Sequence, residues 1–253
     1  MFIRRINELR KSGLTLVDMH SHTVISDGFQ SPVDCFNFAK KNNFGLCITD
    51  HDEVYGNSFA NNKVFNIPST EVTSSECIDL LLYFRSYDDS LFFYNKYIKN
   101  NKLRERPFLF RKLSLSSHEL IDYAKNFNAV IAIPHPHTVR PKNSFLFFTK
   151  NKENRELLKR CDAIEGINSA ISKPRNIKAV NWAFELNKPL IASSDAHEMK
   201  YLGSALTAAY ASNQEDFLEA VIKNKTMIVA KPLSPINRMI TGMKILYNNI
   251  KII

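Results

Sequence analysis

The chain has 253 residues, 44% of them hydrophobic, and carries a net charge of +9. These values are ordinary for a soluble globular protein with a sizeable core. The basic balance favours anionic partners such as phosphoesters or nucleic acid, although a solvated basic surface would give the same charge. No apolar run approaches the roughly 18 residues of a membrane span, so no membrane partner is expected.

Cysteine usage and the first residues bear on the compartment. The four cysteines are widely spaced and form no C-x-x-C pair, which favours buried, reduced thiols over disulfides or metal ligands. The opening MFIRRINELRK lacks the apolar core of a signal peptide. We therefore expect a cytoplasmic protein.

Short apolar runs alternate with helical patterns along the first half. Thr15–Met19 is predicted as a strand, and the helix Ser31–Lys41 begins with Ser31 as N-cap and Pro32 at its first position. The remaining elements of this half are the strand Phe44–Thr49, a helix at 56–62, a strand near Lys63–Pro68, the strand Cys77–Phe84 and a helix from Asp88 to Asn100.

A basic stretch, Lys99–Leu113, interrupts this alternation and is interpreted as an insertion or loop. The alternation then resumes. The predicted strands are Ala129–Ile133, Asp162–Ile167, Pro189–Ser193 and Thr226–Ala230, and the predicted helices are Ser117–Lys125, Pro174–Leu186, Gln214–Ile222 and about 235–250. About seven strand–helix cycles predict an α/β protein with a parallel sheet and outer helices, most simply one barrel domain over residues 1–253.

Acid-rich clusters that contain six of the seven histidines fall at the predicted strand ends. They are Val17–Gly28, Ile48–Asp52, Pro68–Thr73, Ile133–His137 and Ser193–His197. Imidazoles and carboxylates that arrive from several loops are typical of a multinuclear metal site. In barrels of this class the catalytic groups lie at the carboxyl ends of the strands, where these clusters are expected to meet.

The spacing within two clusters strengthens the metal hypothesis. His20 and His22 are separated by one residue, as are Asp195 and His197. At the end of a strand, side chains two residues apart face the same way and can reach one metal. The alternative for each histidine is a hydrogen-bonded structural residue, which would have to apply repeatedly.

The hydrolytic interpretation follows from the chemistry of such sites. Two divalent ions about 3.5–4 Å apart can generate a bound hydroxide and hold the oxygens of a phosphoester. Glu71, isolated after a predicted strand, is the candidate bridging carboxylate. The sequence contains no G-x-S-x-G, G-x-x-x-x-G-K-[ST] or G-x-G-x-x-G motif, so no rival nucleophile or glycine cradle is indicated.

These motifs, in this order, resemble those of the PHP (polymerase and histidinol phosphatase) family. Asp18–Gly28 is similar to its first motif, Ile48–Asp52 to the second, Pro68–Ser74 to the third, Ala132–Pro136 to the fourth and Ser194–His197 to the last. The similarity runs from about residue 15 to 210. It implies a distorted (β/α)7 barrel with two or three divalent ions, for which Mn²⁺ is favoured over Zn²⁺, Fe²⁺ or Mg²⁺.

The resemblance also implies a ligand set. The first ion would be held by His20, His22, Glu71 and Asp195; a second by Glu71 and His135; and a third by Asp27, His51 and His197. Asp18, Asp50 and Asp52 would orient imidazoles from behind. Asp195, His197 and His22 are the candidate catalytic residues, with Asp195 or a nearby histidine relaying the proton.

One position departs from the family pattern. The family often has a histidine ligand in the form E-L-H-L-L-G-Y, whereas the matching segment CIDLLLY has Asp79 there. An acid inside an apolar run needs a partner, so we expect Asp79 to ligate the second ion. A carboxylate oxygen would shift that site towards Mn²⁺ or Mg²⁺, and weak occupancy is the alternative.

The substrate is less defined than the metal site. Candidate substrate contacts are Arg140, Lys142, His137 and Arg175. The leading hypothesis is a phosphoesterase that uses a metal-bound hydroxide on a small phosphorylated metabolite or nucleotide. Basic and aromatic residues in Lys99–Leu113 leave an exonuclease on single-stranded nucleic acid as an alternative. A non-catalytic metal-binding regulatory module is another, and the oligomeric state is not indicated.

Overall fold

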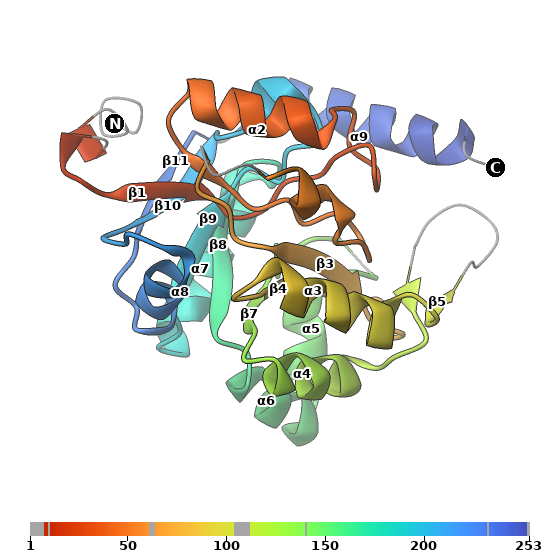
Figure 1. Cartoon of the computed structure of the whole chain (residues 1–253). Coiled ribbons are helices and arrows are strands. Elements are labelled where there is room, and N and C mark those ends of the chain that lie inside the picture. Colours follow the sequence, from red (N-terminus) through yellow and green to blue (C-terminus); the bar gives the residue numbers. More distant parts are fainter. Residues whose placement is uncertain are drawn as a thin grey trace.

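The computed structural model describes residues 8–9, 11–60, 64–103, 112–139, 141–231 and 233–251. Its strands form a mixed α/β fold with helices placed around two larger sheets (Figure 1). One sheet has the order β11-β10-β1-β2, the second has the order β3-β4-β7-β8-β9, and β5 pairs with β6 alone. The strands are β1 Thr15–Asp18, β2 Gly45–Leu46, β3 Ser69–Thr73, β4 Asp79–Tyr83, β5 Lys102–Leu103, β6 Lys112–Leu113, β7 Val130–Ile133, β8 Ala163–Asn168, β9 Leu190–Ser193, β10 Ala205–Ala209 and β11 Met227–Ala230.

The mixed α/β class is confirmed, but the expected parallel sheet is wrong in part. β1–β2, β7–β8 and β8–β9 are parallel, whereas β3–β4, β4–β7, β1–β10 and β10–β11 are antiparallel. β3 and β4 are antiparallel because the connection between them is short. In this connection the Ser74 N–H donates to the Ile78 carbonyl at 2.9 Å. So few residues cannot carry the crossover that parallel strands require.

The (β/α)7 barrel is not confirmed, because the strands described here do not form a closed ladder. Isolated bridges connect the two larger sheets instead, at Leu46–Asn66, His51–Glu71 and Ser21–Ala196. One of these bridges joins His51 and Glu71 of the predicted metal site, and another joins Ser21 and Ala196, each of which lies between two predicted ligands. The edges of the sheets therefore meet where the histidine-bearing segments lie. The single-domain organisation remains a prediction.

Alternating side chains of β4 show how the sheets are packed. Leu80 and Leu82 belong to a cluster shared with the outer helices, whereas Leu81 and Tyr83 belong to one that also contains Val17 of β1. Successive residues of a strand point to opposite faces, so β4 is buried on both sides. The Tyr83 hydroxyl donates to the Met19 carbonyl at 2.8 Å, which satisfies its polar atom inside the core.

The predicted cap of α2 is confirmed, because the Ser31 side chain accepts from the Asp34 N–H. On α4 the N-cap is Ser116, one residue before the predicted start of the helix, and it forms a capping box with Glu119. The helices α5 and α6 were not expected. The α-helices are α2 Pro32–Lys41, α3 Tyr87–Phe93, α4 Ser117–Asn126, α5 Ser144–Thr149, α6 Lys152–Lys159, α7 Lys173–Glu185, α8 Gln214–Ile222 and α9 Pro235–Lys251; the shorter turns are a 3₁₀ helix at Tyr55–Phe59, a π-helix at Tyr94–Ile98 and a 3₁₀ helix at Met199–Tyr201.

The last helix, α9, is attached mainly through polar groups. Thr241 and Lys244 contact the Glu198 carboxylate at 2.8 and 2.7 Å. The apolar side chains of Ile236, Met239 and Met243 are 60–65% exposed. Amphipathic spacing in this helix would suggest an apolar face docked on the fold, but these three side chains, in the part of α9 described up to residue 245, do not form one. Within the described ranges, no helix is both long and apolar enough to cross a membrane.

Candidate metal centre

His20 and His22 follow β1, and their imidazoles contact each other. The Ser21 hydroxyl between them donates to the Cys47 carbonyl at 2.8 Å, which fixes the segment against the β2 strand. The two Nε2 atoms are 3.0 Å apart, and both side chains are fully buried. The predicted His-x-His geometry is therefore present in the structure.

Glu71 is the residue on which four imidazoles converge. Its Oε2 lies 3.2 Å from His20 Nε2, 3.4 Å from His22 Nε2 and 3.3 Å from His51 Nδ1. Its Oε1 lies 3.2 Å from His135 Nε2. Glu71 lies inside β3 and not after a strand, because the third strand starts later than predicted.

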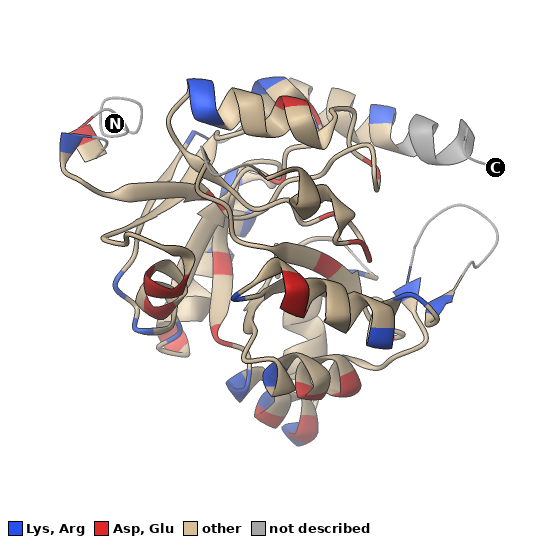
Figure 2. Cartoon of the chain, in the orientation of Figure 1, with Lys and Arg blue, Asp and Glu red and all other residues tan. Residues whose placement is uncertain are grey.

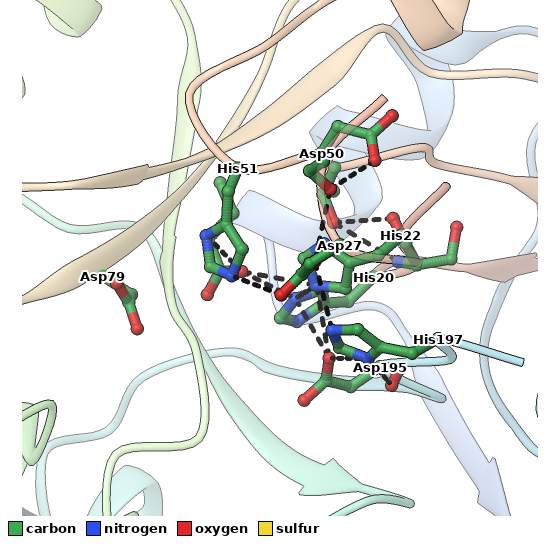
Figure 3. A network of polar contacts seen from close by, with 12 residues as sticks. His20, His22, Asp27, Asp50, His51, Asp79, Asp195 and His197 are labelled. Carbon is green, nitrogen blue, oxygen red and sulfur yellow. Dashed lines mark hydrogen bonds and ion pairs between the residues drawn. The ribbon is translucent and has the colours of Figure 1, made fainter. Parts of the chain in front are cut away.

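One part of the site, here called the histidine end, continues from His22 towards Asp195, Asp27 and His197 (Figure 3). Asp195 Oδ1 is 3.3 Å from His22 Nε2. Asp27 Oδ1 is 3.3 Å from His197 Nε2 and 3.6 Å from His22 Nδ1. Asp195 adopts φ 51°, a left-handed conformation that costs energy outside glycine and is concentrated at functional sites.

The opposite part, here called the lysine end, contains His135, Asp79 and Lys142. Asp79 lies on the side of His51 away from His197 (Figure 3). Its Oδ2 is 3.9 Å from His135 Nε2 and 3.0 Å from Lys142 Nζ, and its Oδ1 accepts from the Thr73 hydroxyl at 2.6 Å. Asp79 is therefore close to the predicted second site, but its nearest charged partner is an ammonium group.

Glu165 of β8 is a site residue that the sequence did not reveal. Its carboxylate lies 3.0 Å from His20 Nδ1 and accepts from the His135 backbone N–H at 2.6 Å. It also accepts from the Asn168 amide at 2.9 Å and from the Ser193 hydroxyl. The available signal was an acid within the apolar strand Ala163–Asn168, where a buried carboxylate needs partners.

The three aspartates expected behind the imidazoles have other partners. Asp18 accepts from the backbone N–H groups of Ser194 and Gly203, and Asp52 accepts from that of Thr73. The carboxylate of Asp50 accepts from the Thr23 N–H at 2.7 Å, the Thr23 hydroxyl at 2.6 Å and the Ser26 hydroxyl at 2.6 Å. These aspartates hold the loops that carry the candidate ligands, and Glu165 is the carboxylate that contacts the Nδ1 atom of His20.

Burial and opposing charges perturb the protonation of the site. Burial alone lowers the pKa of His20, but Asp195, Glu71 and Glu165 raise it well above its usual value. For His197, burial is outweighed by Asp27, and its pKa rises to about 9. For His135, the same competition with Glu71 gives a pKa of about 9. These imidazoles therefore keep a proton at neutral pH in the absence of metal.

The remaining groups shift in the opposite direction. Burial lowers the pKa of His51 to about 4, so this imidazole is neutral at neutral pH. Burial raises the pKa values of Asp27, Glu71 and Asp195, but neighbouring histidines outweigh it and hold all three well below the usual carboxyl value. The pKa of Lys142 is raised, because Asp79 and Glu71 outweigh the effect of burial.

The residues present fit divalent cations. Groups of three donors have ligand atoms within 4.8 Å of one another: His20, His22 and Glu71; His22, Asp195 and His197; His22, Asp27 and His51; and His51, Glu71 and Asp79. The Nδ1 atoms of His22, His51 and His135 are buried without a hydrogen-bond partner. Buried orphan nitrogens beside ionised carboxylates form a donor set that suits transition metals.

The predicted substrate contacts, unlike the predicted metal ligands, do not all lie together. His137 packs on the Phe145 ring, with ring centroids 4.4 Å apart, and is half-buried. Arg175 lies in the first turn of α7, and Lys142 contacts Asp79. Arg140 lies outside the described residues, as do positions 104–111 of the basic stretch.

Comparisons with known proteins agree with the motifs. Residues 173–226 match the PHP-associated family. An uncharacterized protein of Methanocaldococcus jannaschii is 28% identical over 193 residues, which are 75% of this chain and 68% of that protein.

Three solved structures share the fold. A two-domain Bacteroides vulgatus protein with a predicted PHP-like metal-dependent phosphoesterase is 16% identical with a TM-score of 0.56, over 91% of this chain and 69% of that one. The lesion-specific endonuclease PfuEndoQ from Pyrococcus furiosus is 18% identical with a TM-score of 0.63, over 85% of this chain and 57% of that one. PsfC from Pseudomonas syringae is 15% identical with a TM-score of 0.60, over 93% and 98%. The chain is therefore similar to PHP-associated proteins over residues 173–226, and it shares its fold with structures that include one containing a predicted PHP-like metal-dependent phosphoesterase.

Proposed function

We propose that the chain is a metal-dependent hydrolase of phosphoesters, acting on a small phosphorylated metabolite or nucleotide. The observation that carries the proposal is Glu71, a buried carboxylate whose two oxygens face four imidazoles from three separate segments. A carboxylate in that position can bridge two cations, and a bridged pair is the arrangement used for phosphoester hydrolysis.

We propose that the metal ligands are divided among the ions as the resemblance to the PHP family implies. We propose that His20, His22, Glu71 and Asp195 hold one ion, that Glu71 and His135 contribute to a second, and that Asp27, His51 and His197 hold a third. We propose Mn²⁺ as the native metal, because mixed imidazole and carboxylate donors suit it. Bound ions would supply an activated water and Lewis-acid contacts to the phosphate oxygens.

Protein groups would complete the reaction. Asp195 is ionised at neutral pH, because His20 and its neighbours lower its pKa, so it can accept the proton of the attacking water. His197 and His22 lie beside it as the other candidate catalytic residues. Arg140, Lys142, His137 and Arg175 remain the proposed contacts to the substrate, with the basic groups offsetting phosphate charge.

The test is hydrolysis of p-nitrophenyl phosphate and bis(p-nitrophenyl) phosphate with added Mn²⁺. His20→Ala and Asp195→Ala should abolish the metal-dependent rate. His118→Ala is the matched control, because that imidazole is exposed on α4 and pairs with Asp122. Unchanged activity in either site variant would reject the proposal. A folded, metal-loaded wild type that hydrolyses neither ester nor any phosphorylated metabolite would favour the non-catalytic regulatory module.

A nuclease is the second candidate. Endonuclease Q shares the fold, including a structure in complex with a 27-mer duplex containing an abasic lesion. Basic residues are present in the β5–β6 hairpin at the base of the stretch that the sequence singled out, although acidic and basic residues are interspersed over the helices (Figure 2). Our proposal in this case is single-stranded nucleic acid, held by that stretch.

Salt dependence separates the two candidates. Nucleic-acid binding should weaken steeply as salt rises, because phosphate contacts release counterions, whereas a small ester should respond weakly. Charge reversal of the basic residues in Arg104–Lys112 should impair only a nuclease. Reversal of the exposed Arg155 and Lys159 on α6 is the control.

We also propose a cytoplasmic location. The four cysteines are free thiols, and three of them are buried. A chain that keeps unpaired thiols fits a reducing compartment.

A further inference from the structure

The lysine end contains an ion pair that the proposed division of metal ligands does not use, between Asp79 and Lys142, which is also a proposed substrate contact. Lys142 Nζ lies 3.0 Å from Asp79 Oδ2, and only 1% of the Asp79 side chain is exposed. A buried carboxylate needs a compensating charge, and the ammonium supplies it directly. The pair belongs to the chain alone and requires no bound ion.

Each carboxylate oxygen of Asp79 has a different partner: Oδ1 accepts a hydrogen bond, whereas Oδ2 accepts none and is paired by charge with Lys142. Oδ1 accepts from the Thr73 hydroxyl at 2.6 Å, and Thr73 is the register partner of Asp79 between β3 and β4. The carboxylate is thus fixed by a paired strand on one oxygen and by Lys142 on the other. A metal ligand, in contrast, keeps at least one oxygen directed at the cation.

A divalent ion on Asp79 would also meet the ammonium. Oxygen ligands bind small divalent ions at about 2.1 Å, so an ion on Oδ2 would lie within about 5 Å of Lys142 Nζ. Two cations at that distance repel each other strongly in a partly buried site. The ion and the ammonium therefore compete for the same carboxylate.

We propose that the Lys142 ammonium is the resident cation of the lysine end, so that the protein binds one divalent ion fewer than its imidazoles and carboxylates could hold. Asp79 then anchors the lysine and is not a metal ligand. The assignment replaces the ligand role that the sequence predicts for Asp79, and it depends on the metal-binding part of the proposed function but not on the substrate.

The test counts bound metal without substrate. Wild type and variants are stripped with chelator, reloaded with MnCl₂, desalted and analysed for manganese per chain by mass spectrometry. Lys142→Met removes the charge and keeps the length of the side chain, and it should bind one additional ion. Lys142→Arg keeps the charge and should match wild type. Lys159→Met, at a lysine whose side chain is 69% exposed, is the matched control and should also match wild type.

The manganese count of Asp79→Asn is an independent test of the assignment. If Asp79 anchors the lysine, this variant should bind no fewer ions than wild type, whereas His20→Ala should bind fewer. A Lys142→Met protein that is folded by circular dichroism and has the wild-type count would overturn the assignment. So would an Asp79→Asn protein that loses an ion, and this second result decides the question even where Lys142→Met does not fold. Absence of manganese from wild type would reject the proposed function itself, and the assignment with it.

Discussion

The two ends of the site contain similar donors but differ in how their charge is balanced. At the histidine end, the carboxylates of Asp27 and Asp195 face imidazoles. At the lysine end, the carboxylate of Asp79 faces an ammonium. An imidazole can release its proton and then offer a lone pair to a cation. An ammonium has no lone pair to offer, so a cation that binds the same carboxylate must displace it. Similar carboxylates in one pocket are therefore not equivalent as metal ligands.

Loss of Glu71 should impair metal binding at both ends of the site, because imidazoles of both ends contact its carboxylate. Glu71→Gln is expected to reduce hydrolysis to the level without added metal and to lower the manganese count by more than any other single substitution. Glu76→Gln, at an exposed capping carboxylate near Ser117, is the matched control. Retention of the full count in Glu71→Gln would show that the carboxylate does not bridge.

Glu165 contacts both ends, through His20 Nδ1 and the His135 backbone. Partners that orient a ligating imidazole typically contribute about 10–100-fold in metal affinity. Glu165→Gln should therefore weaken Mn²⁺ binding by about that factor, as measured by calorimetric titration. The exposed Glu156→Gln is the control. An affinity equal to wild type would assign Glu165 a role in folding alone.

The pH dependence of metal binding should report two protonated imidazoles, His197 at the histidine end and His135 through its contact with Glu71. Mn²⁺ binds neutral imidazole, and the pKa values of His135 and His197 are raised to about 9 in the metal-free protein. Metal must displace those protons below pH 9, so affinity should increase with pH up to about that value and then level off. His51, with its pKa lowered to about 4, should contribute no proton release near neutrality. Titration in buffers of different ionisation enthalpy counts the protons, and a flat affinity between pH 6.5 and 9 would contradict this prediction.

The same pKa values predict the stability of the metal-free fold. A histidine whose pKa is raised from about 6.5 to about 9 on folding stabilises the protein below pH 6.5. That contribution is lost as the pH rises through 9. Urea unfolding of chelator-treated protein should therefore show stability falling between pH 6.5 and 9, and saturation with Mn²⁺ should remove much of the decline.

The smallest effect is expected at Asp50, which supports only the histidine end. Its carboxylate accepts three hydrogen bonds from Thr23 and Ser26, in the loop that carries Asp27. Asp50→Asn should cost about 1–3 kcal/mol in the free energy of unfolding, because buried donors lose charged acceptors. Urea denaturation measures this, and the response of manganese binding to Lys142→Met should persist in the Asp50→Asn background. An unchanged unfolding free energy would show that the loop is held by other contacts.

Local spacing predicted one feature of the arrangement, the proximity of His20 and His22. His20 and His22 are two residues apart at a strand end, and period-two geometry alone is enough to place both imidazoles on one side. The strand–helix alternation likewise predicted an α/β fold. The antiparallel β3–β4 pair was missed because it depends on a short connection, in which Cys77 adopts φ 63°. The pattern of apolar residues in a strand does not show whether the strand pairs parallel or antiparallel with the next one.

Contacts between residues far apart in the sequence could not be predicted from local spacing. An isolated acid at Asp79 correctly indicated a buried partner, but the sequence did not show that a lysine beyond the fourth motif would provide it. Glu165 had no neighbouring histidine in the sequence, because its imidazole partner, His20, comes from the segment after β1. In both cases the pairing is set by which strands become neighbours.

The four-fold sharing of Glu71 has a consequence for how the protein fills with metal. An ion that binds one oxygen of this carboxylate redistributes charge for every imidazole around it, so successive ions cannot bind independently. Saturation curves should depart from a sum of separate hyperbolas, and partially loaded preparations should contain mixed populations whose composition depends on the order in which metals are added.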